Sequence, residues 1–416
     1  MIMILVPLAI ATAVGMYALW PRHVSAHIQQ NVSQYSVKGL TLPTAVITKV
    51  RPMSCSGQVG YIPDSADDGQ CANLTVRVLD GPGTGQLATV TLTQAQFASG
   101  AKVGQKVKVS RVPASGQASY EFSDFDRMVP LLAFGALFAL AVIFVARWRG
   151  AAALVGLGFA GFVLMDFMFP ALVSGENPLL VALVGSSAIV FVVLYAAHGF
   201  STRTTTALVG TLFGLVLTAG LGWVATRWGH LTGVVTEDDY LLAASAPDLK
   251  LAGVVLCGII VAGLGVLNDV TVTQASAVWE LAESNPEQKK LFSRAMRIGR
   301  DHIASSVYTI AFATAGAGLS TLLLITVYRR PLAEVAQTEA LSEEILRTLV
   351  GAVGLILAMP LTTIIGVAVV HASQRGVARL QPAVATSHRP AKPERSRGRT
   401  RTRQSSLGFD DLFGDD

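Results

Sequence analysis

The chain has few charged residues for its length. Asp, Glu, Lys and Arg make up only 14% of its 416 residues, whereas soluble domains contain about 25%. Hydrophobic residues make up 51%. This composition excludes an ordinary soluble protein and places much of the chain in lipid.

The sequence also lacks the common catalytic motifs. It has no phosphate-binding Gly-x-x-x-x-Gly-Lys loop, no His-Glu-x-x-His zinc helix and no Gly-x-Ser-x-Gly elbow. An aspartyl protease would need two facing aspartates, and the two candidates, Asp166 and Asp269, are predicted towards opposite sides of the membrane. We therefore expect no enzyme, no cofactor and no metal centre.

Cysteine is scarce, with three residues in the whole chain. Cys55 and Cys71 fall in a segment predicted to lie outside the cell, where an oxidising compartment lets them pair. A disulfide there would contribute about 3 kcal/mol in the chain-entropy model. Free thiols or metal ligands remain alternatives, although no His or further Cys stands at ligand spacing. Cys257 lies in an apolar helix and is expected to act as a small apolar residue.

Long apolar runs fill most of the sequence. A run of roughly 17 to 25 residues can cross a bilayer, so we expect an α-helical membrane protein with about eight transmembrane helices. The first run lacks the basic start of a signal peptide and is long, which favours an uncleaved anchor. The predicted spans are 1–20, 129–147, 151–172, 178–198, 204–226, 249–267, 303–327 and 347–371.

Basic residues in the short loops set the predicted orientation, because Lys and Arg mark the cytoplasmic side. Arg147, Arg149 and Arg203 assign two short turns to the cytoplasm, and the acidic segment 227–248 reads as external. Loop 268–302 is rich in Lys and Arg and reads as cytoplasmic. We expect a plasma-membrane protein with both termini in the cytoplasm and residues 21–128 outside.

Residues 40–127 alternate between apolar and polar side chains, as half-buried strands do. Five short strands in fewer than ninety residues indicate a small OB-like barrel or sandwich. Because no aromatic or basic face stands out, a structural or protein-docking module is the favoured role. The predicted strands are Ala45–Val50, Leu74–Leu79, Ala88–Leu92, Lys106–Val112 and Ser119–Phe125.

The predicted domains are a transmembrane anchor (1–20), an extracytoplasmic β domain (21–128), a helix bundle (129–372) and a disordered cytoplasmic tail (373–416). The arginines of the tail and of loop 268–302 suit anionic lipid headgroups. No nucleic acid is expected as a partner. Within the loop, residues 276–297 read as an amphipathic helix lying on the membrane surface. Glycines of the sixth span permit close helix contact, within one chain or in a homo-oligomer.

One carboxylate directly follows an apolar helix. Leu251–Leu267 leads into Asn268 and Asp269, and a charged group at membrane depth costs roughly 2.5 to 3.5 kcal/mol on insertion scales. Arg300 opens the next helix, so Asp269 and Arg300 are expected within ion-pair reach. The alternative is that both are solvated among the headgroups. The candidate ion-coupling residues are Asp269, Arg300, Asp301, Asn268, Thr271, Thr273 and Asp166.

Several motifs resemble the bacterial YibE/F-like family of multi-pass membrane proteins. They are Pro170-Ala171 with Gly175-Glu-Asn177-Pro178, His198-Gly199-Phe200-Ser201 with Thr204, Gly263-Leu-Gly265-Val-Leu-Asn268-Asp269-Val-Thr-Val with Ser276 and Glu280, and Arg297-Ile-Gly299-Arg300-Asp301-His302. The resemblance implies a predicted inner-membrane permease whose substrate is unassigned.

A more distant likeness concerns the SecD/SecF export proteins. Asn268-Asp269 is similar to their Asn-Asp-Thr motif, which precedes a surface helix and an arginine-bearing helix. That likeness implies a proton path through Asp269 and Arg300.

We therefore expect a proton- or ion-coupled permease or export-associated transporter. The alternative is a non-transporting membrane scaffold or assembly factor that docks partners through the external β domain and the basic tail.

Overall fold

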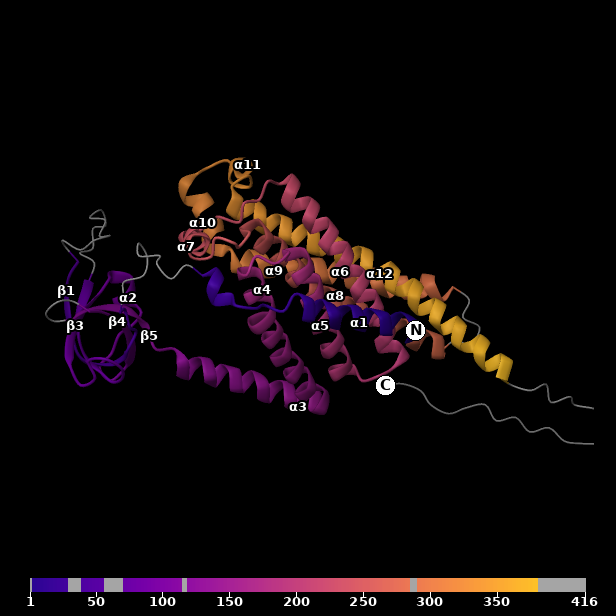
Figure 1. The fold of residues 1–416 in the computed structure, drawn as a ribbon, viewed down its shortest axis with the longest axis horizontal. Coiled ribbons are helices and arrows are strands. Elements are labelled where there is room, and N and C mark those ends of the chain that lie inside the picture. Colours follow the sequence, from indigo (N-terminus) through magenta and orange to yellow (C-terminus); the bar gives the residue numbers. More distant parts are fainter. Residues whose placement is uncertain (1, 29–38, 56–69, 114–117, 285–289, 381–416) are drawn as a thin grey trace, which may run out of the picture. The chain divides into compact units, whose positions relative to one another are not determined.

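The computed structural model of the chain describes residues 2–28, 39–55, 70–113, 118–284 and 290–380 (Figure 1). The predicted basic tail beyond 380 lies outside the described residues. The structure consists of a small β domain and a helix bundle.

The β domain is one antiparallel sheet in the order β3-β2-β1-β4-β5. β3 and β5, at the two ends of this order, lie close to each other, so the sheet is a nearly closed barrel. The predicted alternatives were a barrel and a sandwich, and the structure has the barrel-like form. Its elements are β1 (Thr44–Ser54), β2 (Gln70–Val78), β3 (Leu87–Leu92), α2 (Gln94–Ala98), β4 (Lys106–Val112) and β5 (Ser119–Phe125).

The alternation of side chains explains this barrel. In β3, Ala88, Val90 and Leu92 are buried while the residues between them are exposed, which is the period-two pattern of a half-buried strand. Cys55 and Cys71 form a disulfide between the end of β1 and the start of β2. The bond therefore links two strands that are already paired in the sheet.

The other helices begin with α1 and follow in chain order after the barrel. They are α1 (Ile2–Ala18), the 3-10 turn η1 (Val24–His27), α3 (Met128–Phe162), the π-helix η2 (Val163–Met168), α4 (Phe169–Val173), α5 (Pro178–His198), α6 (Thr202–Trp228), α7 (Glu237–Ser245), α8 (Leu251–Ser284), α9 (Leu291–Ala317), α10 (Leu319–Tyr328), α11 (Leu332–Val335) and α12 (Glu339–Leu380).

Five helical runs in the described part are long and apolar enough to cross a membrane, or up to six if the bent pair α9–α10 counts as one span. The predicted number of eight is not confirmed. Two expected spans, 129–147 and 151–172, fall in the single run Met128–Val173. Its 46 residues would measure about 69 Å as a straight helix, more than twice the hydrocarbon core. The run is broken at Arg147, whose φ of 54° is not helical.

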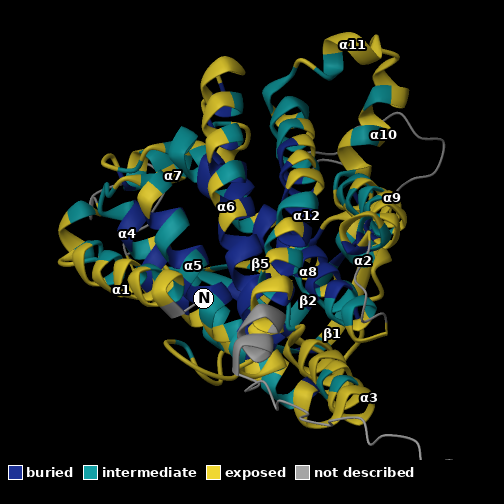
Figure 2. Ribbon diagram, turned by 90° about the vertical axis from the view of Figure 1, so that its right-hand side faces the viewer, coloured by how far each residue is buried: buried dark blue, intermediate teal, exposed yellow. Residues whose placement is uncertain are grey.

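α6 lies at the centre of the bundle and approaches two other helices closely. A Cβ atom added at Gly214 would lie 2.7 Å from Leu267 of α8 and 3.0 Å from Ala358 of α12. Figure 2 shows buried residues gathered where α5, α6, α8 and α12 meet. Small side chains at intervals of four residues allow such an approach. On α6 they are Gly210, Gly214, Thr218 and Gly222.

We predict that a single methyl group at the α6–α12 contact destabilises the bundle. Gly354 of α12 lies directly against the side chain of Thr218, so Gly354→Ala should lower the free energy of unfolding by about 1–3 kcal/mol through overpacking. Thermal unfolding in detergent measures the effect. Gly351→Ala on the same helix meets open space and is the control. Equal melting temperatures for the two variants would contradict the proposed packing.

A second prediction concerns acid stability of the β domain. Hydrogen bonds from the hydroxyl and the backbone N–H of Thr44 lower the pKa of Asp80. The ionised carboxylate therefore adds stability above its unfolded pKa of about 3.9, and this contribution is lost as the pH falls through the lower folded pKa. An NMR titration should show the depressed pKa in the full chain, and Thr44→Val should bring it back towards the usual value. An unchanged Asp80 titration in that variant would contradict the assignment.

Candidate functional site

The predicted boundary at Asn268-Asp269 is not a helix end. α8 continues without a break from Leu251 to Ser284, and α9 begins at Leu291. The predicted end of the helix at Leu267 is therefore wrong. Apart from 285–289, which lie outside the described residues, residues 268–302 lie in these two helices and in the turn at Lys290.

Hydrogen bonding explains why this polar segment stays helical. Thr271 and Gln274 are almost fully buried, and their side chains bond to neighbouring helices rather than to lipid. Helix backbone is satisfied internally, so polar side chains with protein partners can continue an apolar helix at low cost.

The predicted surface helix 276–297 is likewise part of this pair of helices. Val278 of α8, Leu291 and Ala295 of α9 and Val370 of α12 form one buried apolar cluster. The apolar side of the predicted surface helix therefore faces other helices of the protein. Pro286, which would interrupt such a helix, lies outside the described residues.

Asp269 on α8 faces His302 on α9. The Oδ2 atom of Asp269 lies 3.6 Å from Nε2 of His302, which makes an ion pair when the imidazole is protonated. The Asp269 side chain is 69% exposed and that of His302 is 30% exposed. Carboxylate and imidazole groups commonly take up and release protons. At 3.6 Å these two are not hydrogen-bonded, and Nε2 of His302 is buried without a hydrogen-bond partner among the described residues. We call Asp269 and His302 the Asp–His pair.

Arg300 is not the partner of Asp269. It is exposed and forms no ion pair with the residues that the structure describes. The geometry of α9 is the reason, because successive residues turn by about 100° and residues three apart share a face. Gly299 and His302 occupy the face towards α8 and α12, so Arg300 and Asp301 point elsewhere. The expected Asp269–Arg300 pair is therefore wrong.

A buried hydroxyl pair lies two residues along α8 from Asp269. The Oγ1 atoms of Thr271 and Thr211 of α6 are 2.6 Å apart, and both side chains are fully buried. Beside Thr271, Oδ1 of Asn268 is buried and has no hydrogen-bond partner within the described ranges. Buried polar atoms thus lie on the inner side of α8 next to Asp269 in the sequence. Thr273, by contrast, is exposed.

Gln274 connects three helices and was absent from the predicted site. Its Nε2 donates to the carbonyl oxygen of Ala295 on α9 at 3.1 Å and to Oγ1 of Thr363 on α12 at 2.7 Å. Gly299 packs against its amide oxygen, where a Cβ atom would lie only 2.9 Å away. The sequence contained a pattern that indicates this role, because residues 271 and 274 lie on one face of the helix and that face continues the buried side of the preceding apolar residues.

Asp166 lies in the π-helix η2 and its side chain is exposed. Met168 of the same element packs against Gly185 of α5, which fixes η2 against that helix. Nothing that the structure describes brings Asp166 into contact with the Asp–His pair. In the same described ranges, no three His, Cys, Asp or Glu side chains converge as metal ligands would.

A comparison with protein families decides what kind of protein carries this arrangement. A profile described as YibE/F-like protein matches residues 134–372, which is more than half of the chain. The chain belongs to the YibE/F-like family. Comparisons with curated proteins and with solved structures give no significant match. With its long apolar helices, this YibE/F-like chain is a membrane protein.

The motifs that carry the family resemblance have visible structural roles. The side chain of Asn177 accepts hydrogen bonds from the first turn of α5, with Pro178 at its first position. Gly199 ends α5 with a φ of 73°, a left-handed conformation that suits glycine. Ser201 caps α6 through the backbone N–H of Thr204. These motifs set helix ends, whereas the 263–302 block builds the Asp–His pair and its surroundings.

We predict that Gln274 holds α9 in place. Gln274→Leu removes two buried hydrogen bonds and leaves the carbonyl of Ala295 without its side-chain partner, so the free energy of unfolding should fall by about 1–2 kcal/mol. Thermal unfolding of the full chain in detergent tests this. The control is Gln337→Leu, because Gln337 makes an exposed bond within one turn. A melting temperature for Gln274→Leu as high as that of the control would contradict the role.

Proposed function

We propose that this YibE/F-like protein is a proton- or ion-coupled permease or export-associated transporter of the bacterial inner membrane. The observation that carries the proposal is the Asp–His pair between α8 and α9, together with the buried polar side chains of Asn268 and Thr271 on the same stretch of α8. Ionisable residues on membrane helices are costly and mark ion or proton pathways. Asp269 and His302 are the coupling groups in this proposal.

The polar atoms next to the pair support proton exchange with the bundle interior. Asn268 presents a buried carbonyl oxygen, and the Thr271–Thr211 hydroxyl pair continues the polar atoms to α6. Arg300 and Asp301 follow on exposed positions of α9. We propose that they set the local field at the entrance rather than contact the carboxylate of Asp269. Asp166 remains a separate candidate point on the path.

We also propose the orientation that the basic loops predict. The end of the α8–α9 hairpin and both chain termini would be cytoplasmic, and residues 21–128 extracytoplasmic. Arg294 and Arg297 near the start of α9 suit anionic headgroups at that surface.

Proton flux into liposomes tests the proposal. The full chain should carry a flux driven by an imposed membrane potential, reported by a trapped pH dye. Asp269→Asn should abolish it, because the amide cannot exchange a proton, and His302→Gln should reduce it and shift its pH profile. Glu280→Gln is the control, since Glu280 is an exposed carboxylate on the same helix. Wild-type flux in Asp269→Asn would overturn the assignment.

A second candidate function is a membrane scaffold that docks partners through the β domain or the basic tail. The 69% exposure of the Asp269 side chain favours it, because a coupling carboxylate is commonly enclosed. In that case liposomes with the wild-type chain would show no flux above empty ones. Pull-down through residues 40–127 would then recover stable partners, with no change in the Asp269→Asn variant.

A further inference from the structure

A second polar region lies at the other end of the helices that carry the Asp–His pair. Two cavities of about 350 Å³ and 600 Å³ share four lining residues, Val235, Ala340, Glu344 and Arg347. Together they form one cleft between α7, α8, the bent pair α9–α10 and α12. On α8 the cleft includes Val255, which is fourteen residues, or about 21 Å of helix, from Asp269.

The larger cavity has mainly apolar walls, whereas the walls of the smaller one are mixed polar and apolar. Leu242 of α7 and Leu251 of α8 line the smaller cavity, and Leu322 of α10 and Ile345 of α12 line the larger one. Volumes of roughly 300–1,000 Å³ with apolar walls and few polar groups are typical of sites for small organic molecules.

The charged side chains of the cleft are unbalanced. Arg347 donates hydrogen bonds to the carboxylates of Glu343 and Glu344, which lie on the same helix, and the bond to Glu344 is 3.0 Å long. Asp239 of α7 also lines the cleft. Two carboxylates therefore share one guanidinium, while Oδ2 of Asp239 accepts hydrogen bonds from Val235 and Thr236 at the start of α7. The second oxygens of Glu343 and Glu344 have no hydrogen-bond partner in the part of the chain that the structure describes.

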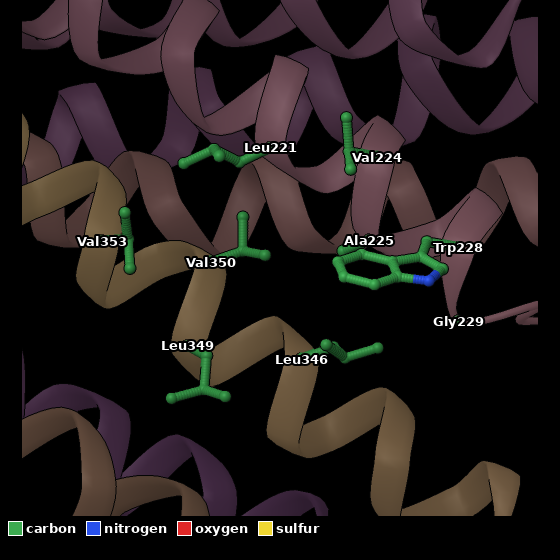
Figure 3. Close-up of a pocket in the computed structure, with 9 residues that line it drawn as sticks. All are labelled: Leu221, Val224, Ala225, Trp228, Gly229, Leu346, Leu349, Val350 and Val353. Carbon is green, nitrogen blue, oxygen red and sulfur yellow. The ribbon is translucent and has the colours of Figure 1, made fainter.

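This combination selects the chemistry of the ligand. Carboxylates beside apolar walls are poorly solvated and are stabilised by an opposite charge. An inorganic ion would keep its water against the apolar walls, whereas an organic cation can satisfy both the carboxylates and the walls. Figure 3 shows the contrast on a neighbouring face of α12, where an apolar groove of about 420 Å³ beside α6 has no charged side chain.

We propose that the cleft binds a hydrophobic organic cation, and that such cations are the substrate class of the transporter. The assignment of these cations as transport substrates rests on the proposed function, whereas their binding to the cleft does not. α9 connects the two regions, since it carries His302 near its middle and lines the cleft from Ala311 to Ala317 at its end. The hydroxyls of Thr314 and Thr348, 3.1 Å apart, join α9 to α12 within the cleft.

Equilibrium binding tests the proposal without any transport. Isothermal titration of the purified full chain in detergent with tetraphenylphosphonium should show one saturable site. Tetraphenylborate has nearly the same shape and the opposite charge, and should bind at least tenfold more weakly. Equal binding of the two ions would overturn the cation assignment.

Two sets of variants locate the site. Glu343→Gln with Glu344→Gln should weaken tetraphenylphosphonium binding at least tenfold. Because that change also removes the partners of Arg347, a second variant fills the cleft instead and keeps both carboxylates: in Gly258→Val the new Cβ atom lies 3.9 Å from Nη2 of Arg347. Gly265→Val on the same helix meets open space and is the matched control. Unaltered binding in Gly258→Val would overturn the location.

The two proposals fail in different ways. Saturable tetraphenylphosphonium binding together with absent proton flux supports the cleft and overturns the transport function. Proton flux that depends on Asp269, without selective binding of the cation, overturns the cleft and leaves the coupling site in place.

Discussion

The close approach of α6 to α8 and α12 is the constraint on which the rest of the bundle depends. Lipid supplies no hydrophobic drive for two apolar helices to associate, so the contact relies on shape and on hydrogen bonds. Gly214 and Thr218 allow the backbones to approach, and the Thr211–Thr271 bond fixes their register. Because α9 then packs onto α8 and α12 through Gly299 and Gln274, the position of His302 follows from the same contact.

The polar groups of the bundle gather at two levels on α8, α9 and α12. One level contains Asp269 and His302, and the other contains Arg347 with its two glutamates. Helices are stiff over this length, so a displacement of α9 at one level moves its residues at the other. Gly318, where α9 and α10 meet at 67°, is the place at which such a displacement can be absorbed.

Sequence patterns predicted the strands of the barrel and the start of α5 at Pro178, since alternation and capping are local properties. They also located the segment around Asp269. They placed the end of α8 wrongly, because Thr271 and Gln274 look unsuited to a buried helix until their partners on α6, α9 and α12 are known. The pairing of Asp269 with His302 instead of Arg300 depends on the rotation of α9 about its axis, which Gly299 sets through contacts distant in sequence. Glu343 and Glu344, which precede the predicted span 347–371, were not among the predicted site residues.

The buried threonine side chains of α6 bond to their own helix. The hydroxyls of Thr206, Thr211 and Thr226 each donate to the carbonyl oxygen four residues earlier in the same helix. Such a bond is supplementary, because that carbonyl already accepts from the backbone. Rotation about χ1 therefore releases the hydroxyl without unwinding a turn. α6 can in this way turn either a methyl group or a hydroxyl towards the helices packed against it while its backbone stays fixed.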